Sequence, residues 1–188
     1  AAIFGEVCAT SDVPAGVGVS VLFDSATVVS TATYPENTAS YPSVSSILGS
    51  ADDTSTGSGV QSVEIALVDA INRYWAGLGT GWTGNCGTGC TPWQSAVFVG
   101  SSSGTWSYSN MNAATFSANS TYRLFVRSVD RAGNTPADPP SFVAGGSTFT
   151  IDPSTPTSVV TAPSNGANLP GTGSLSTISG TATDSSLG

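Results

Sequence analysis

Several oxygen-bearing side chains stand where predicted strands begin or end. Carboxylate and amide oxygens brought together from different loops are the ligands that Ca²⁺ prefers. The same residue types also favour turns, because their side chains bond to the nearby backbone. The sequence therefore leaves two interpretations open, a calcium site or a set of turn residues, for Asp24, Asp52, Asp53, Asp130 and Asn134.

Catalytic chemistry is disfavoured by the residue types that the chain lacks. It contains no histidine and no lysine, and its four basic residues are all arginine. A Ser-His-Asp triad is therefore impossible, and acid–base or nucleophilic catalysis would lack its usual groups. A paired-carboxylate hydrolase could draw on the 12 acidic residues, but these stand at strand ends rather than in a shared cleft. We expect a protein that is not an enzyme.

The net charge of the chain disfavours some classes of binding partner. The net charge is −8, and no basic cluster interrupts it, which argues against nucleic acid and against anionic membrane surfaces. The longest apolar runs, at 17–23 and 65–68, are too short to span a bilayer. Only 9% of the residues are charged, against roughly 25% in an ordinary soluble domain, so serine, threonine, glycine and alanine form the surface.

Four aromatic residues fall within or directly after a long insertion predicted at 70–92. Exposed rings beside amide side chains could stack on the rings of a glycan. Alternatively, the rings pack on the sheet as a small core that holds a glycine-rich loop in place, which is the favoured interpretation. The four residues are Tyr74, Trp75, Trp82 and Trp93.

The three cysteines indicate an oxidising environment. Cys86 and Cys90 are separated by Gly-Thr-Gly, and no histidine is present to complete a zinc site. A short-loop disulfide is favoured over free thiols, and it implies an extracellular location. Cys8 is left either as a buried thiol or for pairing with another chain.

Period-two alternation is the main structural signal. Tyr122, Leu124 and Val126 fall on one side of a segment that ends in the turn at 130–134. The segment 63–75 fits either a helix or a strand. Many short strands separated by glycine, serine, asparagine and proline predict an all-β sandwich or barrel. The predicted strands cover 27–33, 44–51, 60–69, 93–99, 104–109, 121–130 and 147–151.

In the second of these strands, alternate residues should face the core. These are Ile47, Gly49 and Ala51.

The sequence also repeats at a fixed spacing. Ile47 and Ile178 are 131 residues apart, and so are Gly49 and Gly180, within two similar segments. Such a period is typical of a modular array. We predict a complete module at 25–153 and the first strands of a following module at 154–188. Residues 1–24 are then the end of a preceding module or an N-terminal assembly strand.

Several short motifs follow one another in a set order. They are Ile47-Leu-Gly-Ser-Ala-Asp-Asp53, Gly59-Val-Gln-Ser-Val-Glu-Ile65, Tyr74-Trp-Ala-Gly77, Trp106-Ser-Tyr108, Asp130-Arg-Ala-Gly-Asn134 and Phe149-Thr-Ile-Asp-Pro-Ser-Thr-Pro156. Together they resemble the bacterial immunoglobulin-like repeats that occur in tandem in large surface and filament proteins. The resemblance covers nearly all of 25–153 and the start of the next repeat.

This resemblance implies an immunoglobulin-like Greek-key β-sandwich. In that fold, the loops after two of the strands lie at the same end as the incoming linker, so the five candidate calcium ligands would share one pole. In related repeats, such joints can bind Ca²⁺ and stiffen the array. Asp152 and Asp184 would belong to the equivalent joint with the next module.

The function expected from these observations is structural. The chain would be a module of an extracellular filament or giant cell-surface protein that assembles with copies of itself or with adjacent modules, end to end or by strand complementation. Two strands with an apolar face are not stable alone, so residues 154–188 should be covered by something else. The alternative function is a carbohydrate-binding or adhesive module that acts through the aromatic insertion.

Overall fold

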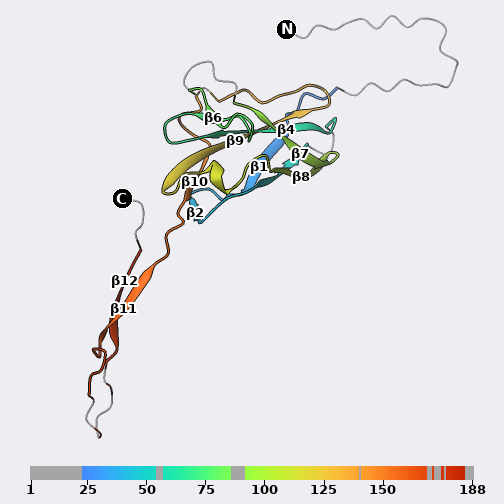
Figure 1. Cartoon of the computed structure of the whole chain (residues 1–188). Helices are drawn as coiled ribbons and strands as arrows, with labels where there is room; N and C mark the ends of the chain where they lie inside the picture. Colours follow the sequence, from blue (N-terminus) through green and yellow to red (C-terminus); the bar gives the residue numbers. More distant parts are fainter. Residues whose placement is uncertain are drawn as a thin grey trace, which may run out of the picture.

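Short strands make up nearly all of the regular structure in the computed structural model, which describes residues 23–53, 57–85, 92–139, 141–168, 171, 175 and 177–184 (Figure 1). The described residues contain no α-helix, so the all-β prediction is confirmed, and 63–75 belongs mainly to a strand. The elements are β1 (Val29–Tyr34), β2 (Ala39–Tyr41), β3 (Ile47–Asp52), β4 (Val60–Val68), β5 (Tyr74–Trp75), β6 (Trp82–Thr83), β7 (Gln94–Gly100), β8 (Ser103–Tyr108), the 3₁₀ turn η1 (Ala113–Thr115), β9 (Ser120–Asp130), β10 (Ser147–Ile151), β11 (Thr157–Ala162) and β12 (Ser179–Thr183).

The main part of the chain is one curled, mixed sheet. Its strand order is β1-β3-β8-β7-β4-β9-β10-β2, and the β5–β6 pair extends from β4. Only the β10–β2 pairing is parallel among the described strands. The start of β7, through Ala96, pairs with β4, whereas its end, from Val97, pairs with β8. A sheet that continues through such a shared strand can curl and enclose a core within itself.

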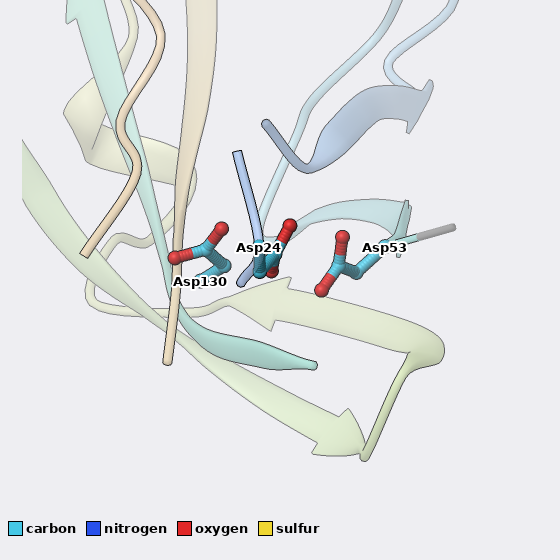
Figure 2. A group of neighbouring side chains, drawn as sticks. All are labelled: Asp24, Asp53 and Asp130. Atoms are coloured by element: carbon cyan, nitrogen blue, oxygen red, sulfur yellow. The ribbon is translucent and has the colours of Figure 1, made fainter. Parts of the chain in front are cut away.

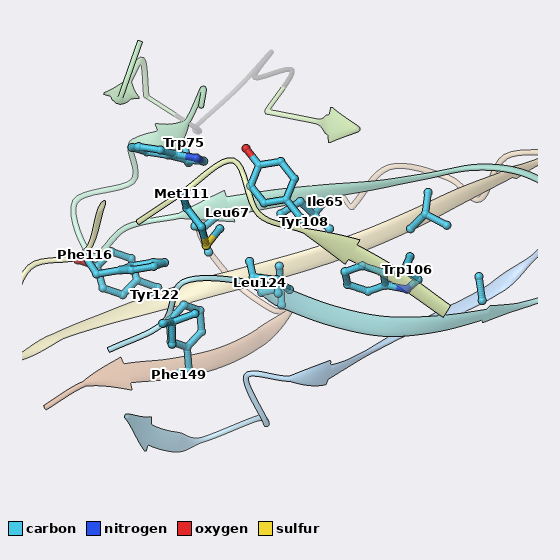
Figure 3. Close-up of a cluster of buried hydrophobic side chains, with 14 of the residues drawn as sticks. Ile65, Leu67, Trp75, Trp106, Tyr108, Met111, Phe116, Tyr122, Leu124 and Phe149 are labelled. Atoms are coloured by element: carbon cyan, nitrogen blue, oxygen red, sulfur yellow. The ribbon is translucent and has the colours of Figure 1, made fainter. Parts of the chain in front are cut away.

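The core lies inside the curl and is built from alternate residues of the strands (Figure 3). Ile47, Ile65 and Leu124 are almost completely buried there, next to the aromatic rings of Trp106 and Phe149. The cluster includes residues from β3, β4, β8, β9 and β10, so these elements share one hydrophobic core. Burial of this apolar surface is the main stabilising contribution to the fold.

β3 follows the predicted alternation. Ile47, Gly49 and Ala51 face the core, and the residues between them are exposed. Gly49 lies between β1 and the indole of Trp106: a Cβ atom at this position would come within 2.1 Å of the Thr31 carbonyl oxygen and 2.2 Å of a Trp106 ring carbon. The Trp106 indole N–H donates a 3.0 Å hydrogen bond to the Ser50 carbonyl. Only glycine allows the ring to approach this close.

The strand β2 was not predicted. It has three residues, too few for an alternation to be recognised, and it forms because β10 offers a free edge for parallel pairing. The chain leaves β1 at one edge of the sheet and enters β2 at the other, between Tyr34 and Ala39.

A separate two-stranded sheet follows the main one and extends away from it (Figure 1). It pairs β11 with β12 in antiparallel register, with Val160 opposite Gly180. This register resembles that of β1 and β3, in which Ala32 lies opposite Gly49, with a spacing of 131 residues between the two glycines and 128 residues between Ala32 and Val160. In both pairs the register shifts directly after this position, so the two hairpins share their irregularity as well as their pairing.

The position of Gly49 generates a direct prediction. Gly49→Ala should lower the free energy of unfolding by roughly 1–3 kcal/mol or more, because the added methyl group must displace either β1 or Trp106. Gly79→Ala is the matched control, since a Cβ there would meet nothing within 4 Å, and it should change stability by less than about 0.5 kcal/mol. Urea denaturation of the two variants measures the difference. Equal stabilities would contradict the packing described here.

Candidate metal centre

Three carboxylates meet at one end of the curled sheet (Figure 2). Asp24 precedes β1, Asp53 directly follows β3, and Asp130 is the last residue of β9. Each offers an oxygen, and these oxygens all lie within 4.8 Å of one another. The antiparallel pairing of β1 with β3 brings the first two together, because the start of one strand lies beside the end of the other.

Backbone N–H groups hold the Asp24 carboxylate in place. Its Oδ1 accepts a 3.0 Å bond from the N–H of Ala26, and its Oδ2 accepts a 2.7 Å bond from the N–H of Ser58. The second bond joins residues 34 positions apart in the chain. Asp24 therefore ties the segment before β1 to the loop between β3 and β4.

The Asp130 carboxylate is held by the turn that follows β9. Its Oδ1 accepts a 2.7 Å bond from the N–H of Asn134, and its Oδ2 accepts a 2.7 Å bond from the Asn134 side-chain amide. The same amide donates a 3.0 Å bond to the carbonyl of Asp24. Asn134 thus links the third carboxylate to the segment that carries the first.

Asp53 is held on one side only. Its Oδ2 accepts a 2.6 Å bond from the N–H of Gly59, whereas its Oδ1 is buried and has no hydrogen-bond partner among the residues that the structure describes. The side chain as a whole is only 1% exposed. A buried carboxylate oxygen without a donor or a cation is strongly unfavourable, so this atom is the one in the cluster best suited to bind a cation.

Gly57 packs directly against the Asp53 carboxylate. A Cβ atom at position 57 would come within 2.2 Å of Asp53 Oδ1 and 2.3 Å of Cγ and Oδ2, so any larger residue would have to displace the carboxylate.

The charge of the cluster favours a cation. Asp53 and Asp130 are buried and Asp24 is partly buried. None of the three forms an ion pair within the part of the chain that the structure describes, where Arg73 pairs with Asp69, and Arg127 pairs with Glu64 and Asp138. Three neighbouring carboxylates repel one another unless a positive charge compensates them.

The spacing of the three oxygens is compatible with calcium. Ca–O distances are 2.3–2.6 Å, so two ligand oxygens on opposite sides of the ion lie up to about 5 Å apart.

The structure brings together three of the five candidate ligands. Asp52 is exposed on the outer face of β3, because consecutive residues of a strand point to opposite faces. Asn134 contributes its amide N–H groups to the cluster as a positioning residue, through the bonds described above. The backbone donors Ser58 and Gly59 were not predicted, and no side-chain signal could have revealed them.

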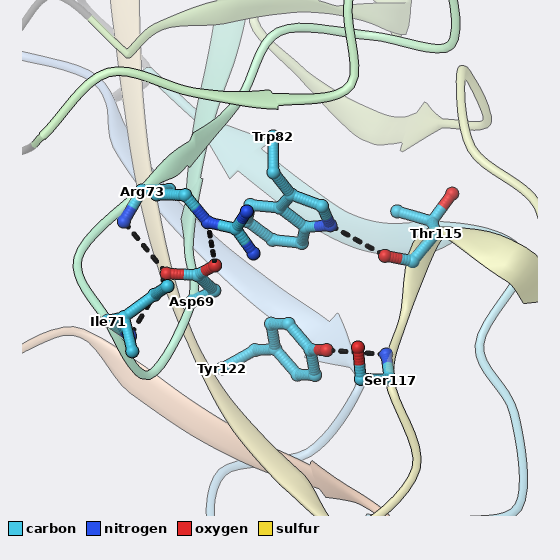
Figure 4. Close-up of polar contacts among 7 residues, drawn as sticks. All are labelled: Asp69, Ile71, Arg73, Trp82, Thr115, Ser117 and Tyr122. Atoms are coloured by element: carbon cyan, nitrogen blue, oxygen red, sulfur yellow. Dashed lines mark hydrogen bonds and ion pairs between the residues drawn. The ribbon is translucent and has the colours of Figure 1, made fainter.

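The aromatic residues of the insertion make contacts within the protein, and one of them, Trp75, is buried. Its indole N–H donates a 3.0 Å bond to the Asn110 carbonyl. Trp82 stacks on Tyr122 with ring centroids 5.3 Å apart, and it donates a 2.6 Å bond to the Thr115 carbonyl (Figure 4).

Two further members lie in a second, smaller cluster. Trp93 packs against Phe142, and the guanidinium of Arg127 lies 4.3 Å from the centroid of the Trp93 ring. Tyr74 packs against the same cluster. These contacts favour a packing role for the insertion. Contact of Tyr74, Trp75, Trp82 or Trp93 with a glycan stays a prediction.

The predicted disulfide lies outside the described residues. Neither Cys86 nor Cys90, nor the leftover Cys8, falls within them.

Comparisons with known proteins do not identify the chain. No protein-family model, no curated protein and no solved structure matches it. The resemblance to bacterial immunoglobulin-like repeats therefore stays a prediction. Within the part that the structure describes, no helix has the length and apolar character needed to cross a membrane.

The ionisation of Asp24 follows from its hydrogen bonds. The backbone N–H of Ser58 contributes most, followed by the Ser58 side chain and the N–H of Ala26, and these bonds lower the pKa of the Asp24 carboxyl from its ordinary value of 3.8. The carboxyl is consequently ionised at neutral pH and available to a cation.

This shift predicts an acid-dependent loss of stability. Folding favours the ionised form of Asp24, so its contribution is present above pH 3.8 and is lost as the pH falls through the lower pKa of the folded state. Asp24→Asn lacks this titration. Without divalent ions, the difference in unfolding free energy between wild type and Asp24→Asn should therefore shrink between about pH 4 and pH 2. Urea denaturation across this range tests it, and a pH-independent difference would contradict it.

Proposed function

We propose that this chain is a structural module of a repetitive extracellular protein, and that Ca²⁺ fixes the joints between its units. The observation that carries the proposal is a recurrence. The segment from Asp24 through β1 and β3 to Asp53 has a counterpart from Asp152 through β11 and β12 to Asp184.

Local contacts at the second joint resemble those at the first. Asp24 accepts a bond from the backbone two residues later, and so does Asp152, from the N–H of Ser154 at 3.0 Å. The Ser154 hydroxyl lies within hydrogen-bonding distance of a carboxylate oxygen of Asp152 and of Asp184 and can donate to either. The two carboxylates that would begin a second cluster therefore already lie close together, one unit further along the chain.

We interpret the curled sheet as an immunoglobulin-like Greek-key sandwich. In this interpretation β1, β3 and β8 form one layer, and β4, β9, β10 and β2 form the other, with β7 shared between them. The passage of the chain from β1 in one layer to β2 in the other supports this view, as does the long-range pairing of β3 with β8 and of β4 with β9.

Calcium in this position would control the direction of the incoming chain. Asp24 belongs to the segment that enters the module, whereas Asp53 and Asp130 belong to the module itself. An ion bound by all three adds bonds between the two parts, so the entering segment loses freedom to turn. Rigid joints of this kind suit a load-bearing array.

The location that we propose for such a site is extracellular. Calcium sites in extracellular modules have dissociation constants on the order of 10⁻⁴ to 10⁻³ M, which are filled only where calcium is abundant. The partners that we propose are adjacent modules or copies of the chain within a filament or surface protein. No catalytic role is proposed.

The calcium site gives the decisive prediction for this function. In excess calcium, wild-type protein should be stabilised by roughly 1.4–2.7 kcal/mol at 10 to 100 times the dissociation constant, which raises the Tm by several degrees. Asp53→Asn should abolish this gain, because it removes the charge of the ligand whose Oδ1 lacks a partner. In chelator, the same variant should be as stable as wild type or more stable, because it reduces repulsion among the carboxylates.

Asp52→Asn is the matched control for this experiment. It removes a neighbouring carboxylate that is exposed and outside the cluster, so it should keep the full calcium-dependent gain. Thermal unfolding in calcium and in chelator measures all three proteins. The proposal fails if wild type does not respond to calcium, or if Asp52→Asn and Asp53→Asn behave alike.

A further inference from the structure

The β11–β12 hairpin presents the face that β1 and β3 bury. Ile178 is 68% exposed, whereas Ile47, at the equivalent position 131 residues earlier, is fully buried. Ala182 is exposed, whereas its equivalent Ala51 is 1% exposed. The hairpin therefore has the residues of an inner face, and none of the other described residues buries them.

The edge of β12 is also without a partner strand among the described residues. β3 pairs on one side with β1 and on the other with β8, whereas β12 pairs with β11 alone. An unpaired edge presents a row of backbone N–H and C=O groups that can accept another strand.

Gly180 indicates what kind of strand fits there. At Gly49, a Cβ would meet a carbonyl of the neighbouring strand and the ring of Trp106. At Gly180, a Cβ would meet the equivalent carbonyl, that of Val159, at 2.4 Å, and its other closest contacts are also with β11. Gly180 therefore contacts its neighbouring strand as Gly49 does. The side of the glycine that the Trp106 indole covers in the first module is open at Gly180.

We propose that β12 receives a β-strand of the β8 type, with a tryptophan opposite Gly180. The partner strand would pair antiparallel with β12, as β8 does with β3, where Trp106 lies opposite Gly49. Its indole N–H would donate to the Thr181 carbonyl, the equivalent of the Ser50 carbonyl that Trp106 uses.

The composition of the surfaces supports this partner. Neither β11, with Thr-Ser-Val-Val-Thr-Ala, nor β12, with Ser-Gly-Thr-Ala-Thr, contains a charged side chain. β8, with Ser-Gly-Thr-Trp-Ser-Tyr, contains none either. An uncharged strand therefore meets an uncharged edge, and no charge has to be desolvated without a partner. This inference extends the proposed repeat and does not depend on calcium.

The experiment lengthens the chain at its C-terminal end with a second copy of its own strands. Residues 54–153 are joined after Asp184, which occupies the position of Asp53, so that a copy of β8 follows in the register of the first module. We predict that the amides of β12 exchange with deuterium at least about 100-fold more slowly in the extended chain than in the parent chain, because they become part of a sheet with a core. The comparison is made in chelator, so that failure of the calcium site cannot produce failure here.

Two variants test whether the contact between Gly180 and the tryptophan of the appended strand causes the protection. Gly180→Val in the extended chain should remove the added protection, and so should Trp106→Ser in the appended copy alone. Thr181→Val is the control, because residue 181 lies on the opposite face of the same strand, and it should keep the protection.

Other outcomes overturn the proposal. It is wrong if β12 exchanges equally fast in the extended and parent chains, or if Gly180→Val retains the protection. It is also wrong if the parent chain already protects β12 and sediments as a dimer, since two hairpins would then cover each other.

Discussion

The antiparallel pairing of β1 with β3 is the contact on which the other features depend. It places the entering segment beside the end of β3, and it thereby brings Asp24 next to Asp53. It also requires glycine at position 49, which lets Trp106 close over the pair from β8. One strand pair thus shapes both the core and the carboxylate cluster, and the chain uses the same pair again at β11 and β12.

Period-two alternation made much of this arrangement predictable. The inward-facing residues of β3 could be named in advance because a half-buried strand repeats every two residues. The fixed spacing between Gly49 and Gly180 indicated a repeat, and the two hairpins resemble each other in register. The resemblance to immunoglobulin-like repeats placed the acidic residues at strand ends at one pole, and three of them, Asp24, Asp53 and Asp130, lie together.

The remaining features depend on contacts that side-chain patterns do not reveal. Asp52 and Asp53 are adjacent and chemically identical, and only the burial of one face of β3 decides which joins the cluster. The N–H groups of Ser58 and Gly59 orient two carboxylates, but any residue type carries such a group. The shared role of β7, which makes the sheet continuous, results from a change of pairing partner partway along one strand.

The most direct test of this account is the location of calcium in a crystal of the chain grown with the ion, from its anomalous scattering. We predict one ion among the three carboxylates, about 2.3–2.6 Å from the unpartnered oxygen of Asp53 and from oxygens of Asp24 and Asp130. A cluster that holds only water at saturating calcium, or an ion bound through Asp52 on the outer face, would contradict the account.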